Sequence, residues 1–178
     1  MKLRRPARRA ILVVHVAVSV SWAGITLGLL ALAVTAATTG SPAAAEASYR
    51  SMKLFADWLI VPVALLTLVS GLVLSLGTPW GLAWHRWVYA KFWLTLITTG
   101  LSVFLLLPGI NESTEQAIAG QPLEGTWKLA IGPCVSLSAY LFMTAISVLK
   151  PWGLTRRGRK QRASLHKQVD ARDMRQTA

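Results

Sequence analysis

The sequence lacks the residues and motifs that support several common chemistries. It has one cysteine, Cys134, so no disulfide can form within the chain. It contains no GxGxxG, P-loop, CxxC or HExxH motif, which leaves nucleotide binding by a standard loop and zinc hydrolysis without support. Met and Cys are too few and too scattered to indicate copper handling. No carboxylate lies deep in an apolar segment, which argues against a carrier that cycles a buried acid.

Charge is also missing from four long stretches of the chain. No Asp, Glu, Lys or Arg occurs in residues 10–45, 58–84, 92–111 and 129–149. A surface helix of a soluble protein needs a charged or polar face, whereas about 20 apolar residues cross a hydrocarbon core of roughly 30 Å. The sequence therefore predicts an all-α fold, a transmembrane four-helix bundle with spans at about 10–37, 58–77, 88–107 and 129–149.

These spans divide the chain into a basic arm (1–9), a four-span membrane domain (10–150) and a basic tail (151–178). The first apolar run is longer than the 7 to 15 residue core of a signal peptide, which favours an uncleaved span. We expect a helix that starts at Pro42, runs into the second span and kinks at Pro62. The third span is expected to end at Pro108, before a solvated loop or short helix over 109–125.

The distribution of basic residues predicts the orientation. The formal net charge is +12, and with a cytoplasmic N-terminus every Lys and Arg except Arg50, Lys53 and Lys128 falls on the cytoplasmic side. Most acidic residues fall on the other side. This is the positive-inside pattern, and it places both termini in the cytoplasm of a bacterium, N-in/C-in in the plasma membrane. The expected partners are the lipid bilayer and anionic inner-leaflet lipids rather than nucleic acid.

Two polar stripes run along the first and third spans with the same spacing, i, i+4, i+7 and i+11. Their members are His15, Ser19, Trp22 and Thr26 in the first span and Lys91, Thr95, Thr98 and Ser102 in the third. Each set lies on one helical face, and because both spans run in the same direction the stripes can face each other across the bundle. His15 and Lys91 would then meet near the cytoplasmic end.

An ionisable side chain within a span is costly unless it is paired or hydrated, which makes His15 and Lys91 candidates for function. A structural interpretation stays open for both residues. His15 can be hydrogen-bonded to a Ser or Thr of another helix, and Lys91 can extend its ammonium group to the membrane surface.

The segments HVAVSVSWAGITLGL, YRSMKLFADWLIVPVALLTLVSGLVL, WHRWVYAKFWLTLITTGLSVF and KPWGLTRRGRK resemble a family of four-span bacterial integral membrane proteins of unknown function, over about residues 10–155. More distantly, H-x6-W-x-G in the first span, a Met-Lys pair before the second and W-x3-K at the start of the third resemble the membrane-bound, haem-binding protoporphyrinogen oxidase of bacteria.

The second resemblance implies a haem b site. In that family the first-span histidine and the third-span lysine matter for activity and cofactor, and the matching residues here are His15 and Lys91. The residues expected around the cofactor are His15, as the metal ligand, with Lys91, Trp22, Ser19 and Thr95. A second imidazole ligand would have to be His85 or His166; coordination by one histidine, or no haem, also stays open.

Two other function classes remain open at this stage, and the sequence does not decide whether the chain is an enzyme. One is a non-enzymatic assembly protein, a homo-oligomer or a partner of another membrane protein. It would pack through Gly24 and Gly28 and through the small residues Thr67, Gly71 and Ser75 of the second span. The other is a transporter of a small apolar or cationic solute.

Overall fold

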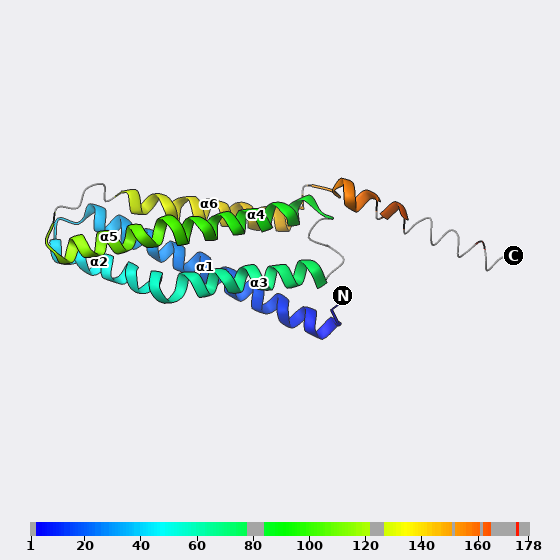
Figure 1. Cartoon of the computed structure of the whole chain (residues 1–178), viewed down its shortest axis with the longest axis horizontal. Helices are drawn as coiled ribbons and strands as arrows, with labels where there is room; N and C mark the ends of the chain where they lie inside the picture. The colour runs from blue at the N-terminus through cyan, green and yellow to red at the C-terminus, as the bar shows by residue number, and fades with distance from the viewer. Residues whose placement is uncertain are drawn as a thin grey trace.

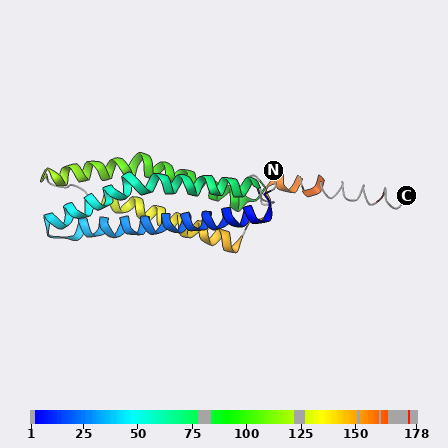
Figure 2. The ribbon, with the colours of Figure 1, turned by 90° about the horizontal axis from the view of Figure 1, so that it is seen from below.

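The structure, a computed structural model, describes residues 3–77, 84–121, 127–150, 152–160, 162–164 and 174. Its elements are α1 (Arg5–Thr38), α2 (Pro42–Phe55), the π-helical turn η1 (Ala56–Ile60), α3 (Val61–Gly77), α4 (Arg86–Leu101), the π-helical turn η2 (Ser102–Leu106), α5 (Leu107–Ile118) and α6 (Lys128–Leu149). The described residues contain no β-strand, only an isolated antiparallel bridge between His85 and Leu154. Consecutive rods run antiparallel, and both chain ends lie at the same end of the bundle (Figures 1 and 2).

Four helical rods are long and apolar enough to cross a membrane. They are Arg5–Thr38, Pro42–Gly77, Arg86–Ile118 and Lys128–Leu149. The all-helical, four-span architecture expected from the charge-free stretches is therefore confirmed at the level of helix number and composition. The rod that begins at Pro42 runs through α2, η1 and α3 without a break, as the sequence predicts.

The third rod does not end at Pro108, where the sequence predicts a stop, but continues to Ile118. A proline within a helix donates no N–H and its ring collides with the carbonyl group four residues earlier. In the second and third rods a π-helical turn ends two residues before a proline, η1 before Pro62 and η2 before Pro108. Such a turn shifts the hydrogen-bond pattern locally, which helps to accommodate the proline within a continuous helix.

The four rods differ in length, and the parts of the three longer rods that extend beyond the shortest one form a cap. At 1.5 Å per residue the 22 residues of α6 span about 33 Å, close to one hydrocarbon core. The other three rods have 33 to 36 residues, roughly 50 Å. Figure 1 shows α2, α5 and the end of α1 extending past the start of α6, at the end away from the chain termini. We call this three-helix part the cap.

A cluster of buried apolar side chains joins the helices of the cap. Leu29 and Ala33 of α1, Tyr49 and Met52 of α2 and Ile110 of α5 are each about 1% exposed or less. The Thr114 hydroxyl donates its one proton mainly to the Ile110 carbonyl at 2.7 Å and more weakly to the Tyr49 carbonyl at 3.3 Å, a contact between α5 and α2. The segment after Pro108 is thus a packed helix.

The neighbours of each helix fix the cross-section of the bundle. α1 packs against α2, α3 and α6, while α4 packs against α3 and α6. The first and third spans therefore lie diagonally opposite, with α3 and α6 between them. This arrangement agrees with two polar stripes that face each other across the bundle.

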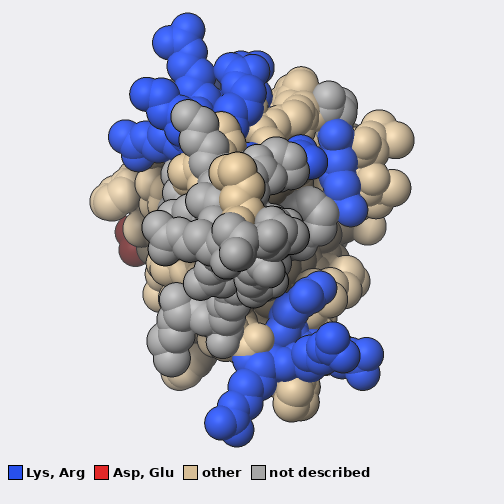
Figure 3. All heavy atoms as spheres, turned by 90° about the vertical axis from the view of Figure 1, so that its right-hand side faces the viewer, with Lys and Arg blue, Asp and Glu red and all other residues tan. Residues whose placement is uncertain are grey.

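Charge is divided between the two ends of the molecule. Figure 3 looks onto the end that carries both termini, where Lys and Arg side chains stand around the edge. The acidic residues that the structure describes, Glu46, Asp57, Glu112 and Glu115, all belong to α2, η1 and α5 at the opposite end.

The beginning of the basic tail packs against the connection before α4. The Thr155 N–H donates to the Trp84 carbonyl at 2.8 Å, and a side chain at Gly158 would collide with that same carbonyl oxygen. This part of the tail is therefore held to the bundle by its backbone.

Candidate functional site

His15 and Lys91, the two ionisable residues predicted for the site, line one cavity of about 310 Å³. The cavity lies at the end of the bundle that carries the termini, and it is walled by the start of α1, the end of α3, the start of α4 and the end of α6. Thr95 of α4 also lines it. We refer to it as the His15–Lys91 cavity.

His15 is held by α3. Its Nδ1 lies 2.9 Å from the Oγ of Ser70, 55 residues further along the chain. The Ser70 hydroxyl already donates its only proton to backbone carbonyls, to Leu66 at 2.6 Å and more weakly to Thr67 at 3.2 Å. Ser70 therefore accepts a hydrogen bond from His15 Nδ1–H, because a hydroxyl has one proton to give. In the neutral imidazole the other nitrogen, Nε2, then carries the lone pair.

Gly71 makes room for the imidazole ring. A Cβ atom at this position would lie 3.0 Å from Cε1 of His15 and 3.6 Å from Nδ1. Any side chain here would press on the ring and disturb its hydrogen bond to Ser70. The sequence marks Gly71 as part of a small-residue packing face, and the structure identifies its neighbour as His15.

Lys91 is held by α6. Its Nζ donates a 2.6 Å hydrogen bond to Oγ of Ser147, and the side chain is half-buried. One turn along α4, the Thr95 hydroxyl lies 3.5 Å from the sulfur of Met143, also on α6. Lys91 thus remains in the wall of the cavity instead of extending along the outer surface.

The cavity combines basic groups with apolar walls. Besides His15 and Lys91 it is lined by Arg8 at the start of α1 and Lys150 at the end of α6, and no Asp or Glu is among the described residues that line it. Its apolar walls include leucines of α1 and α3 and Phe92 of α4. Such a lining suits a ligand with a large apolar body and acidic groups at its edge.

Trp22 and Ser19, two further residues predicted for the site, lie outside the lining. The Trp22 ring is buried and stacks at a tilt on Tyr140 of α6, with ring centroids 5.0 Å apart. Ser19 is half-buried one turn beyond His15. The polar stripe of the first span therefore faces inward, but only its first member, His15, reaches the cavity.

The other two histidines do not join His15. His85 lies in the connection before α4, where it bridges to Leu154 and lies beside Trp87, and it does not line the cavity. His166 falls outside the described residues. Within those residues no group of three or more His, Cys, Asp or Glu side chains is arranged to hold a metal ion. Among the described residues, His15 is thus the one histidine that lines the cavity.

Comparisons of the chain with protein-family models, with characterised proteins and with solved structures find no match.

Proposed function

We propose that this chain is a plasma-membrane protein that binds a porphyrin, with haem b as the leading candidate, in the His15–Lys91 cavity. The observation that carries the proposal is that His15 and Lys91, from diagonally opposite helices, line one apolar cavity with an imidazole whose Nε2 bears the lone pair. The proposal includes an orientation with both termini in the cytoplasm, and the basic residues that gather at their end of the bundle support it.

The residues of the cavity suit haem in two respects. A neutral imidazole whose other nitrogen donates a hydrogen bond is the usual state of a metal-ligating histidine, and Ser70 provides that acceptor for His15. Arg8, Lys91 and Lys150 are cations for the two carboxylates of the porphyrin. The volume of about 310 Å³ is at the small end of ligand pockets, so a porphyrin would enter the cavity with one edge.

Each residue has a distinct task in this proposal. His15 supplies the ligand nitrogen, Ser70 fixes the tautomer and the ring orientation, and Lys91 contributes positive charge within the wall. The apolar side chains exclude water from the macrocycle. Bound haem would supply one-electron chemistry, with a potential set by its ligand and surroundings.

The direct test is the visible spectrum of the full-length protein purified in detergent from haem-replete cells. We expect a Soret band that His15→Ala removes. His85→Ala is the matched control and should keep the band, because His85 lies outside the cavity. If the wild-type protein shows no Soret band even after haemin is added, the proposal is wrong.

An assembly role is a second candidate, and one observation favours it. Gly24, on the first span, is exposed, and a Cβ added there would meet no atom within 4 Å, so the helix backbone is open to a neighbour. Gly28, by contrast, is already covered by Phe55. Crosslinking in membranes should then give a defined larger species that Gly24→Leu abolishes, and a strictly monomeric chain would contradict this role. Transport of a cationic solute is disfavoured by the basic lining.

A further inference from the structure

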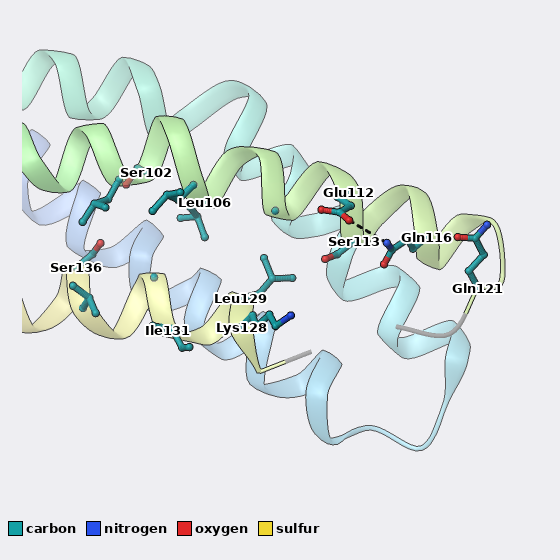
Figure 4. Close-up of a pocket in the computed structure, with 15 residues that line it drawn as sticks. Ser102, Leu106, Glu112, Ser113, Gln116, Gln121, Lys128, Leu129, Ile131 and Ser136 are labelled. Atoms are coloured by element: carbon teal, nitrogen blue, oxygen red, sulfur yellow. Dashed lines mark hydrogen bonds between the residues drawn. The ribbon is translucent and has the colours of Figure 1, made fainter. Parts of the chain in front are cut away.

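A second, larger cavity of about 810 Å³ lies at the other end of the bundle, between η2 and α5 on one side and α6 on the other (Figure 4). It exists because the helices separate at the cap. There α5 packs against α2, while α6 packs against α1, which leaves the side between α5 and α6 open. We refer to it as the cap cavity. It shares no residue with the His15–Lys91 cavity and is independent of the porphyrin proposal.

The cap cavity is polar at its mouth and apolar along its walls. Glu112 and Gln116 of α5 stand on one side of the mouth and Lys128, the first residue of α6, on the other (Figure 4). Below them the walls are apolar and include Leu105 of η2 and Ile131 of α6. This gradient follows the membrane, because α6 is about one hydrocarbon core long and its first residue marks the level of the head groups.

The inner end of the cavity lies deep in the apolar part of the bundle. Ser102, the first residue of η2, is 4% exposed and lines the cavity. It lies ten residues before Glu112, about 15 Å along the helix axis. The cavity is therefore deep enough to hold an acyl chain below its mouth.

We propose that the cap cavity binds a glycerophospholipid with a zwitterionic, amine-bearing head group. One carboxylate and one ammonium group at the mouth match the ammonium and phosphate of such a head group, with Glu112 facing the amine and Lys128 the phosphate. The apolar walls hold an acyl chain.

The test is native mass spectrometry of the full-length protein in detergent, titrated with two lipids that have identical acyl chains. One is phosphatidylethanolamine, and the other is phosphatidylglycerol, which lacks the amine. We expect a single bound phosphatidylethanolamine with roughly tenfold higher affinity than phosphatidylglycerol. Glu112→Gln should abolish the preference. Glu115→Gln, the same change on the same helix outside the cavity, should keep it.

Phosphoethanolamine alone, the head group without chains, should not bind at the same concentrations.

Three outcomes would overturn the proposal: equal affinity of the wild-type protein for both lipids, equal effects of Glu112→Gln and Glu115→Gln, or tight binding of phosphoethanolamine alone. Glu112 makes only a 3.3 Å surface hydrogen bond with Gln116, so Glu112→Gln is expected to fold. Circular dichroism of each variant checks that it folds. Lys128→Gln is the second variant at the mouth, and it should weaken the binding of both lipids equally, because both carry the phosphate.

Discussion

The imidazole of His15 and the hydroxyl of Ser70 join α1 to α3 through a hydrogen bond of 2.9 Å, near the end of the bundle that carries both chain termini. The same hydroxyl donates to the backbone of its own helix, and so the direction of the bond to His15 is fixed. One serine therefore decides which nitrogen of the histidine is left for a ligand.

Ser70→Ala removes the acceptor for His15 Nδ1–H. We expect a loss of about 1 kcal/mol in the free energy of unfolding, since a half-buried donor loses its partner. We also expect haem affinity to fall by roughly 10 to 100-fold, because the ring is no longer held in one tautomer and orientation. Thermal unfolding in detergent and a haemin titration measure the two effects. The control is Ser21→Ala, which removes an exposed hydroxyl bonded only to the backbone of α1. If both variants bind haemin equally well, Ser70 does not position the histidine.

Gly71→Ala places a methyl group against the His15 ring. We expect the ring to be displaced and haemin affinity to fall roughly tenfold or more. The helix itself should become more stable by up to about 1 kcal/mol, because alanine favours a helix over glycine. Gly24→Ala makes the same change where a Cβ meets no atom, so it should keep the affinity. Haemin titrations of both variants make the comparison. Unchanged binding by Gly71→Ala would show that the ring can shift without consequence.

Met52→Ala tests whether the cap is a packed core. Met52 is fully buried between the cap helices, so truncation should cost about 2 to 5 kcal/mol in the free energy of unfolding. Leu54→Ala, two residues along the same helix but 58% exposed, should change it by less than about 0.5 kcal/mol. Denaturant titration in detergent micelles measures the difference. Equal effects of the two substitutions would mean that the cap contributes little to folding.

Cysteine labelling in intact cells tests the orientation. In a Cys134→Ala background, Gly40→Cys places a thiol in the connection between α1 and α2, where a side chain meets no neighbour, and Ser164→Cys places one in the basic tail. With both termini in the cytoplasm, a membrane-impermeant maleimide should label residue 40 in intact cells and residue 164 only after permeabilisation. The reverse labelling pattern would show that the chain has the opposite orientation. Labelling of both thiols in intact cells would place residues 40 and 164 on the same, outer side, which contradicts the proposed four-span arrangement.

The helical architecture could be predicted because its cause is local. Four charge-free stretches of sufficient length specify four apolar helices whatever their neighbours are, and the spacing of His15 and Lys91 within their stripes specifies the faces on which they lie. The division of charge between the two ends could likewise be predicted, because it follows from the positions of the charged residues relative to the apolar stretches.

The tertiary structure decided what those faces meet. The helical period predicts the face on which His15 lies, but not that this face contacts Ser70 and Gly71 of α3. It likewise does not predict the hydrogen bond between Lys91 and Ser147. The ring contact between Trp22 and Tyr140 could not be predicted from it either. These contacts depend on which helices are neighbours in the bundle, and this arrangement is set by loop lengths and side-chain packing.

The same distinction explains the cap. A proline predicts a helix end from its missing N–H alone, but a π-helical turn before Pro108 and the burial of Ile110 against α2 carry the helix to Ile118. That continuation draws α5 away from α6 and opens the cap cavity. The sequence by itself thus determined the number of long apolar helical rods and which end of the bundle is basic, because hydrophobicity and charge act residue by residue. Only the packing of those helices decided where the cavities lie, because a cavity is a property of side chains brought together from distant parts of the chain.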